Sequence, residues 1–110
     1  MIIDFDSMET TTLKNFKGGE KEMNAKMYWD GTTRIMRSSL VSGASIGLHR
    51  HEGSCEMIII IKGEGTVIDC DGEAKPIHAG QCHYCPEGEQ HSLINTGEEL
   101  LEFYGIVPKQ

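Results

Sequence analysis

Short segments rich in apolar and β-branched residues alternate with polar, glycine-containing turns along most of the chain. No stretch of 12 residues repeats its apolar positions at a helical period, whereas short alternating or continuously apolar runs are typical of β-strands. Asp30-Gly31 and Asp71-Gly72 are two-residue hairpin signals between such segments. The pattern predicts eight or nine strands, at residues 22–29, 32–41, 45–51, 56–62, 66–70, 73–77, 81–85, 91–95 and 99–107.

Short strands at near-regular spacing form an antiparallel sandwich or barrel, so we predict an all-β fold of antiparallel strands. The length of 110 residues suits one domain, and no linker, repeat or low-complexity segment interrupts it. Glycine, at 13 residues against 3 prolines, fits many tight turns. Residues 1–110 are therefore expected to form a single domain, with residues 1–21 as an N-terminal arm or edge strand.

Charge and cysteine content narrow the function classes. Seventeen acidic and 10 basic residues give a net charge of −7. Because an acidic surface repels phosphate backbones, we expect no nucleic-acid partner. The N-terminus has no basic segment before an apolar stretch, and the longest apolar run, residues 57–61, is far shorter than the roughly 20 residues that span a bilayer. We expect a cytoplasmic protein with no membrane partner, whose four cysteines are thiols.

Three histidines and one glutamate are the strongest candidates for chemistry. His49 and His51 are two positions apart on a predicted strand, so their side chains share a face. After the turn at residues 52–54 the chain reverses, and an inward-facing Glu56 is expected near both imidazoles across the hairpin. His91 opens a later strand. Convergence of these four side chains predicts a divalent-metal site, although an H-x-H pair alone is more often two surface histidines on an edge strand.

The spacing around these residues is more specific than the pair itself. The chain contains the pattern Gly43-x5-His49-x-His51-x4-Glu56-x6-Gly63 and the pattern Gly80-x5-Pro86-x-Gly88-x2-His91-x3-Asn95. These patterns resemble the two sequence motifs of the cupin superfamily at every fixed position. Motif 1 spans residues 43–63, motif 2 spans residues 80–95, and the 16 residues between them resemble the spacing of small single-domain bacterial cupins.

The resemblance implies a cupin-type conserved β-barrel, a small jelly roll, in which His49, His51, Glu56 and His91 bind one metal ion. Manganese, iron, nickel and zinc all suit imidazole and carboxylate donors. Four such ligands on an octahedral ion leave two positions for water, oxygen or a chelating substrate. One carboxylate leaves a divalent ion with a net charge of about +1, so the site favours an anionic oxygen ligand.

Two classes of function remain open. The resemblance implies a metalloenzyme of dioxygenase or isomerase type that acts on a small oxygenated substrate, such as a phenolic, enediol or sugar-derived compound. The alternative is a non-catalytic small-molecule or metal-binding module that acts as a sensor or store, because one fold hosts many chemistries. Tyr84, His83 and Glu52 are general-base candidates only by their proximity to the motifs.

Other chemistry-bearing residues are expected in structural roles. Cys82 and Cys85 form a C-x2-C pair, but residues three apart on a strand point to opposite faces, so the two thiols are not expected to share a metal. His78 and His83 are expected on the outer surface. Asn95 is expected to stabilise a turn rather than to bind the metal.

Two features bear on charge and assembly. Arg34 and Arg37 are the cations nearest the predicted interior; because they are three positions apart, at most one points inward, and the simpler interpretation leaves both in solvent. The run at residues 57–61 is apolar on both faces, with Ile58 and Ile60 expected inside. The other face needs a cover, so we predict a homodimer in which the first strand adds to the neighbour's sheet.

Overall fold

The computed structural model describes residues 1–109, and within this range the chain forms ten strands and two short 3-10 helices, η1 (Phe5–Ser7) and η2 (Phe16–Gly18). The strands are β1 (Thr11–Lys14), β2 (Glu22–Trp29), β3 (Thr33–Leu40), β4 (Ser45–Arg50), β5 (Glu56–Lys62), β6 (Glu64–Ile68), β7 (Ala74–His78), β8 (Cys82–Cys85), β9 (Gln90–Ile94) and β10 (Leu101–Pro108). The nine predicted strands are confirmed, with ends shifted by at most two residues.

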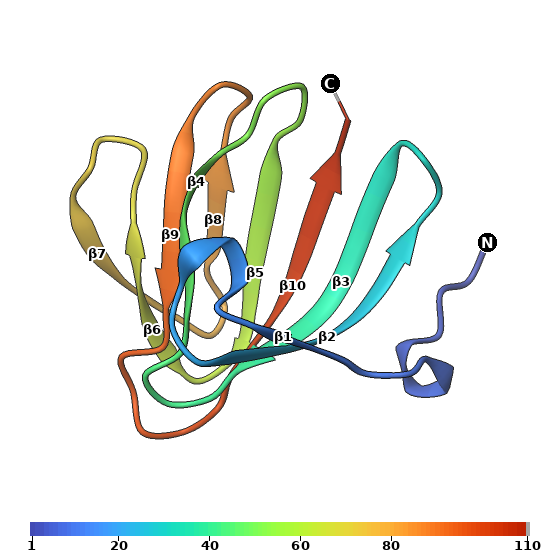
Figure 1. Ribbon diagram of the computed structural model, residues 1–110, viewed down its shortest axis with the longest axis horizontal. Coiled ribbons are helices and arrows are strands. Elements are labelled where there is room, and N and C mark those ends of the chain that lie inside the picture. Colours follow the sequence, from blue (N-terminus) through green and yellow to red (C-terminus); the bar gives the residue numbers. More distant parts are fainter. Residues whose placement is uncertain (110) are drawn as a thin grey trace.

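The strands form two antiparallel sheets that pack face to face (Figure 1). One sheet has the order β1-β2-β3-β10-β5-β8, and the other has the order β4-β9-β6-β7. The sheets do not close into a strict barrel, and the arrangement is the predicted all-β jelly roll. None of the helices in the described part of the chain has the length and apolar character that a membrane crossing requires.

One predicted strand contact is wrong in detail. β4 and β5 follow one another in the chain but belong to different sheets, so Glu56 faces the histidines of β4 across the interior and not across a hairpin. The cause is that strand composition does not say which strand is the hydrogen-bonding partner. β1 pairs with β2 of the same chain, with Thr11 opposite Ala25, and is an edge strand of its sheet as predicted, while its addition to a neighbour's sheet stays a prediction.

The apolar core lies between the two sheets. Phe103, Leu40 and Leu101 are completely buried there, and Ile58 and Ile60 of β5 point inward as predicted. The alternate residues Ile59 and Ile61 lie on the outer face of the same strand, each 37% exposed. The period-2 alternation of a strand therefore separates the two apolar faces of this run.

An irregularity in β4 sets the direction of the two motif histidines. Ile46 is buried opposite Leu93, whereas His49 lies opposite His91, and the pairing register shifts between the two pairs. Residues three apart on a regular strand face opposite sides, so this shift is what lets both Ile46 and His49 point inward. A Cβ atom on Gly47 would lie 2.0 Å from the carbonyl oxygen of Lys17, so glycine is required where η2 crosses the strand.

Candidate metal centre

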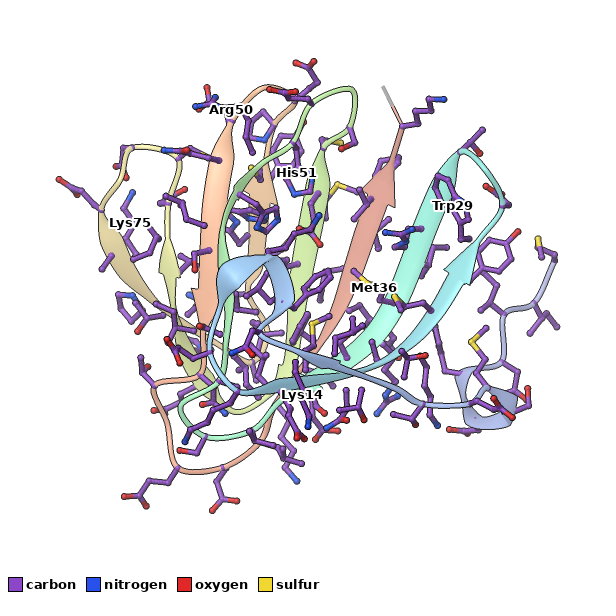
Figure 2. All side chains as sticks on the ribbon, in the orientation of Figure 1. Lys14, Trp29, Met36, Arg50, His51 and Lys75 are labelled. Carbon is purple, nitrogen blue, oxygen red and sulfur yellow. The ribbon has the colours of Figure 1, made fainter. Side chains whose placement is uncertain are left out.

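Four side chains from three parts of the fold meet at the opposite end of the interior from the apolar core. His49 on β4 and His91 on β9 are directly paired in one sheet. Glu56 begins β5 in the facing sheet, and His51 follows the end of β4. Figure 2 shows His51 at the end of the sandwich where the chain passes from one sheet to the other. The structure thus brings the four predicted site residues together.

The spacing of the donor atoms fits a single metal ion. Glu56 Oε1 lies 3.1 Å from His51 Nε2 and 2.9 Å from His91 Nε2, and these two nitrogens are 3.1 Å apart. His49 Nε2 lies 3.9 Å from the same oxygen. Bonds of about 2.1 Å to one octahedral ion place neighbouring ligand atoms about 3.0 Å apart and opposite ones about 4.2 Å apart. The cluster could therefore hold one ion without rearrangement of the strands.

Hydrogen bonds at the rear of two imidazoles orient their Nε2 atoms toward the cluster. His49 Nδ1 lies 2.7 Å from the carbonyl oxygen of Gly47, which can only accept a hydrogen bond. The proton of neutral His49 is therefore on Nδ1, and Nε2 keeps its lone pair. His51 Nδ1 lies 3.2 Å from Ser54 Oγ in the loop that follows β4. Partners of this kind are typical of histidines that bind metals.

His83 is also inside the sandwich, so its predicted surface position is wrong. It is buried, with Nδ1 3.3 Å from His91 Nδ1 and Nε2 3.0 Å from Asp69 Oδ1. β8 pairs with β5, and His83 lies opposite Ile58 and therefore on the same inward face. The alternation along β8 could have placed His83 inside, but only once the pairing with β5 was known. Nothing in the sequence marked Asp69 as a partner of His83, because Asp69 follows β6 in a turn.

Electrostatics favour an ionised carboxylate among neutral imidazoles. Burial raises the pKa of Glu56, but its interactions with the imidazoles of His49, His51 and His91 outweigh burial and hold that pKa well below its usual range. Burial lowers the pKa of His91, against the opposing attraction of Glu56. These are the protonation states in which a carboxylate and an imidazole bind a cation.

A cavity of about 300 Å³ opens onto the cluster. Arg34 lines it, so the interpretation that left both arginines in solvent is wrong for this residue. Arg34 alternates with the buried Met36 and so shares its inward face, whereas Arg37 lies on the outer face against the Tyr104 hydroxyl. Three cationic and two acidic side chains are among those that line this cavity: Lys17, Arg34, Arg50, Glu52 and Glu56.

The sequence-based assignments for the cysteine pair, His78 and Asn95 are confirmed. Cys85 is buried and Cys82 is exposed, so the two thiols face opposite sides of β8, and His78 is exposed. Asn95 donates through Nδ2 to the carbonyl oxygens of Leu40 and Glu99, and its Oδ1 accepts from the Gly97 amide. It therefore stabilises the turn between β9 and β10 and stands apart from the cluster.

Comparison with known proteins agrees with the fold. The model of the cupin domain family matches residues 36–107, and the chain belongs to this family. An oxalate-binding protein of Thermotoga maritima is 34% identical over 113 residues, a match that covers 97% of this chain and 93% of the relative.

Solved structures extend this comparison. A Thermotoga maritima crystal structure described as that of a predicted oxalate decarboxylase is 32% identical, with a TM-score of 0.92 and complete coverage of both chains. A cupin-superfamily structure from Silicibacter pomeroyi described as a sugar phosphate isomerase has a TM-score of 0.78, and the match covers 100% of this chain and 76% of that one. At 18% identity, the second likeness shows the fold alone.

Proposed function

We propose that His49, His51, Glu56 and His91 bind one divalent metal ion and that the loaded site binds a small dicarboxylate, of which oxalate is the simplest. The observation that carries this proposal is the position of Arg34, which lines the cavity that opens onto the cluster and whose guanidinium carbon lies 5.1 Å from the centroid of the Trp29 ring. The name of the 34% identical relative, an oxalate-binding protein, supports the same class of ligand.

The cavity suits a compact anion with oxygen donors. A bound divalent ion would supply a net charge of about +1 and two open positions, which match a ligand that chelates through two carboxylate oxygens. Arg34 would pair with the outer carboxylate oxygens, because a guanidinium presents parallel N–H donors in the spacing of a carboxylate. Lys17 and Arg50 add positive charge to the same wall.

Manganese, iron and nickel suit the proposed site better than zinc. An octahedral ion keeps two positions open beside four protein ligands, whereas zinc in protein sites is most often satisfied by four ligands. Manganese is therefore the ion to use when the ligand is tested.

Calorimetric titration of oxalate tests the proposal. The manganese-loaded protein should bind oxalate, and the metal-free protein should not. Arg34→Met should weaken oxalate binding about tenfold with manganese affinity unchanged, because one charge-assisted pair is lost. Arg37→Met is the matched control, because Arg37 lies on the outer face of the same strand. Equal oxalate affinity with and without manganese contradicts the proposal.

Turnover of a bound substrate is a second candidate, favoured by Glu52. Its carboxylate lines the cavity outside the His/Glu cluster and could hold or accept a proton beside the bound ligand. The iron or manganese form should then consume oxygen with a catechol or enediol, or isomerise an enediol without oxygen uptake. Loss of either activity in Glu52→Gln, with metal binding retained, supports catalysis. No turnover across several metals and substrates leaves a binding module.

We also propose that two chains form a homodimer through the outer face of β5 and β8. Ile59, Ile61 and Tyr84 are exposed large apolar side chains on this face, and Met57 lies beside them opposite Tyr84. Light scattering should give twice the mass of one chain, and Ile59→Lys should shift the protein toward one chain mass. A single-chain mass for the unmodified protein at micromolar concentrations contradicts the dimer.

A further inference from the structure

Beyond the four candidate ligands, a line of hydrogen-bonding groups runs from the cluster toward the protein surface. His91 directs Nε2 toward Glu56 and Nδ1 toward His83 Nδ1, 3.3 Å away. On its other side, His83 Nε2 lies 3.0 Å from Asp69 Oδ1. Asp69 in turn bonds Lys75 Nζ through Oδ2 at 2.9 Å. The line crosses from β9 through β8 to the turn after β6.

The proton positions along this line follow from its two ends. An ion bound at His91 Nε2 leaves the proton of that neutral imidazole on Nδ1. His91 Nδ1–H then donates to His83 Nδ1, which must be unprotonated and must accept. The proton of neutral His83 is therefore on Nε2, from which it donates to the Asp69 carboxylate. Each contact has one donor and one acceptor, so the whole line is satisfied in a single tautomeric arrangement.

Asp69 is held as the charged end of this line. Its Oδ1 accepts the Cys70 backbone amide at 2.7 Å, and its Oδ2 accepts Lys75 Nζ, whose other partner is Asp71. Hydrogen bonds from Lys75, from the Cys70 amide and from His83 hold the pKa of Asp69 well below its usual range. The carboxylate is thus fixed in place and accepts from His83.

Asp69, Cys70 and His83 could instead be read as a second metal site, because their donor atoms also lie within 4.8 Å of one another. The contacts disfavour that reading. Both oxygens of Asp69 are already bonded, one of them to the ammonium of Lys75, and burial raises the pKa of the Cys70 thiol, which keeps it protonated. The positive charge of Lys75 would repel a second metal ion, and the neutral Cys70 thiol would bind it poorly.

We propose that His83 and Asp69 are positioning residues that fix the orientation and tautomer of His91 as a metal ligand. The proposal rests on the proposed metal site. His49 and His51 have single rear partners, a carbonyl oxygen and a hydroxyl, whereas the rear partner of His91 is an imidazole backed by a carboxylate. A rear partner of this kind raises the basicity of the ligand imidazole and limits its rotation.

The zinc affinities of matched variants, measured by titration, test this proposal. Zinc is the metal to use because it is diamagnetic, so the loaded protein can also be studied by NMR. His83→Leu, which removes the acceptor, should weaken zinc binding about 10- to 100-fold. His83→Asn should restore most of the affinity, because its Oδ1 can accept from His91 near the position of Nδ1. Asp69→Asn should cost less than His83→Leu. His78→Leu is the control, since His78 is exposed on β7.

Imidazole nitrogen shifts of the zinc-loaded protein give a readout that a purely structural role does not predict. They should place the proton of His91 on Nδ1 and that of His83 on Nε2. If His83→Leu does not fold, the zinc affinity of Asp69→Asn and the nitrogen shifts of the parent protein test the positioning role by themselves. Unchanged zinc affinity in the folded His83 and Asp69 variants, a His83 proton on Nδ1, or a second zinc ion lost in Asp69→Asn would overturn the positioning role. A parent protein that binds no zinc or manganese overturns the metal site itself.

Discussion

The two ends of the interior are built on the same strands but differ in what holds them together. On β5, the inward positions change from Glu56 to Ile58 and Ile60 within a few residues, and on β9 they change from His91 to Leu93. One end is an apolar core and the other is a buried polar cluster. Alternation decides which face of the sheet a residue occupies, whereas its position along the strand decides whether it meets the apolar core or the polar cluster there.

The free energy of burying side chains also differs between the two ends. Burial of apolar side chains is favourable in proportion to the area removed from water. Burial of a carboxylate is unfavourable unless hydrogen bonds compensate it, and Glu56 has three imidazoles as partners. The apolar end should therefore contribute most of the stability of the fold, and the polar end should provide the ligands that bind the metal ion.

Phe103→Ala should give the largest change in stability. This side chain is completely buried in the apolar core, so its truncation should lower the free energy of unfolding by about 3–5 kcal/mol. Urea denaturation of the metal-free protein measures the loss. Manganese affinity of the folded variant should stay within about twofold of the parent, and a large fall in that affinity would show that the two ends are not separate.

His91→Ala should give the opposite outcome. Metal affinity should fall by about 100-fold or more, because one of four ligands is lost and no neighbour replaces it. Metal-free stability should change by less than in Phe103→Ala. Cys82→Ser is the control, since this exposed thiol should not affect metal content. Undiminished metal affinity in His91→Ala contradicts the role of this residue as a ligand.

The sequence also predicts the two ends to different extents. Alternation within one strand placed Ile58 and Ile60 inside and separated Cys82 from Cys85, because both decisions need only local geometry. The inward position of His83 depends on the pairing of β8 with β5, which no local pattern contains. Local reasoning therefore predicted the core more completely than the surroundings of the site.

The candidate site itself was predicted from spacing. His49, His51, Glu56 and His91 were selected by the two motifs, although the route by which Glu56 reaches the cluster was wrong. Alternation along β3 would have placed Arg34 inside only if its phase relative to the interior had been known. The register shift in β4 shows why phase is not readable from composition, because one irregularity reverses the faces of all the residues that follow.

The smallest effect on stability is expected at the hairpin between β2 and β3, at the rim of the polar end. Asp30 accepts the Thr32 and Thr33 backbone amides, and these bonds lower its pKa from 3.8 to about 2. Because the folded-state pKa is lowered, the contribution of Asp30 to stability is complete above about pH 4 and is lost as the pH falls through about 2. Carbon NMR should find Asp30 still ionised at pH 3. Half-protonation near pH 3.8 would mean that these bonds do not form in solution.

Anomalous diffraction from crystals of the manganese-loaded protein would locate the metal ion and identify its ligands. We predict one manganese ion per chain within about 2.0–2.3 Å of Nε2 of His49, His51 and His91 and of a Glu56 carboxylate oxygen. Oxalate added to the same crystals should occupy the two remaining positions on the side of Arg34. An ion held by Asp69, Cys70 and His83 instead, or a manganese-replete protein with no ion among the three histidines and Glu56, would contradict the proposed metal site.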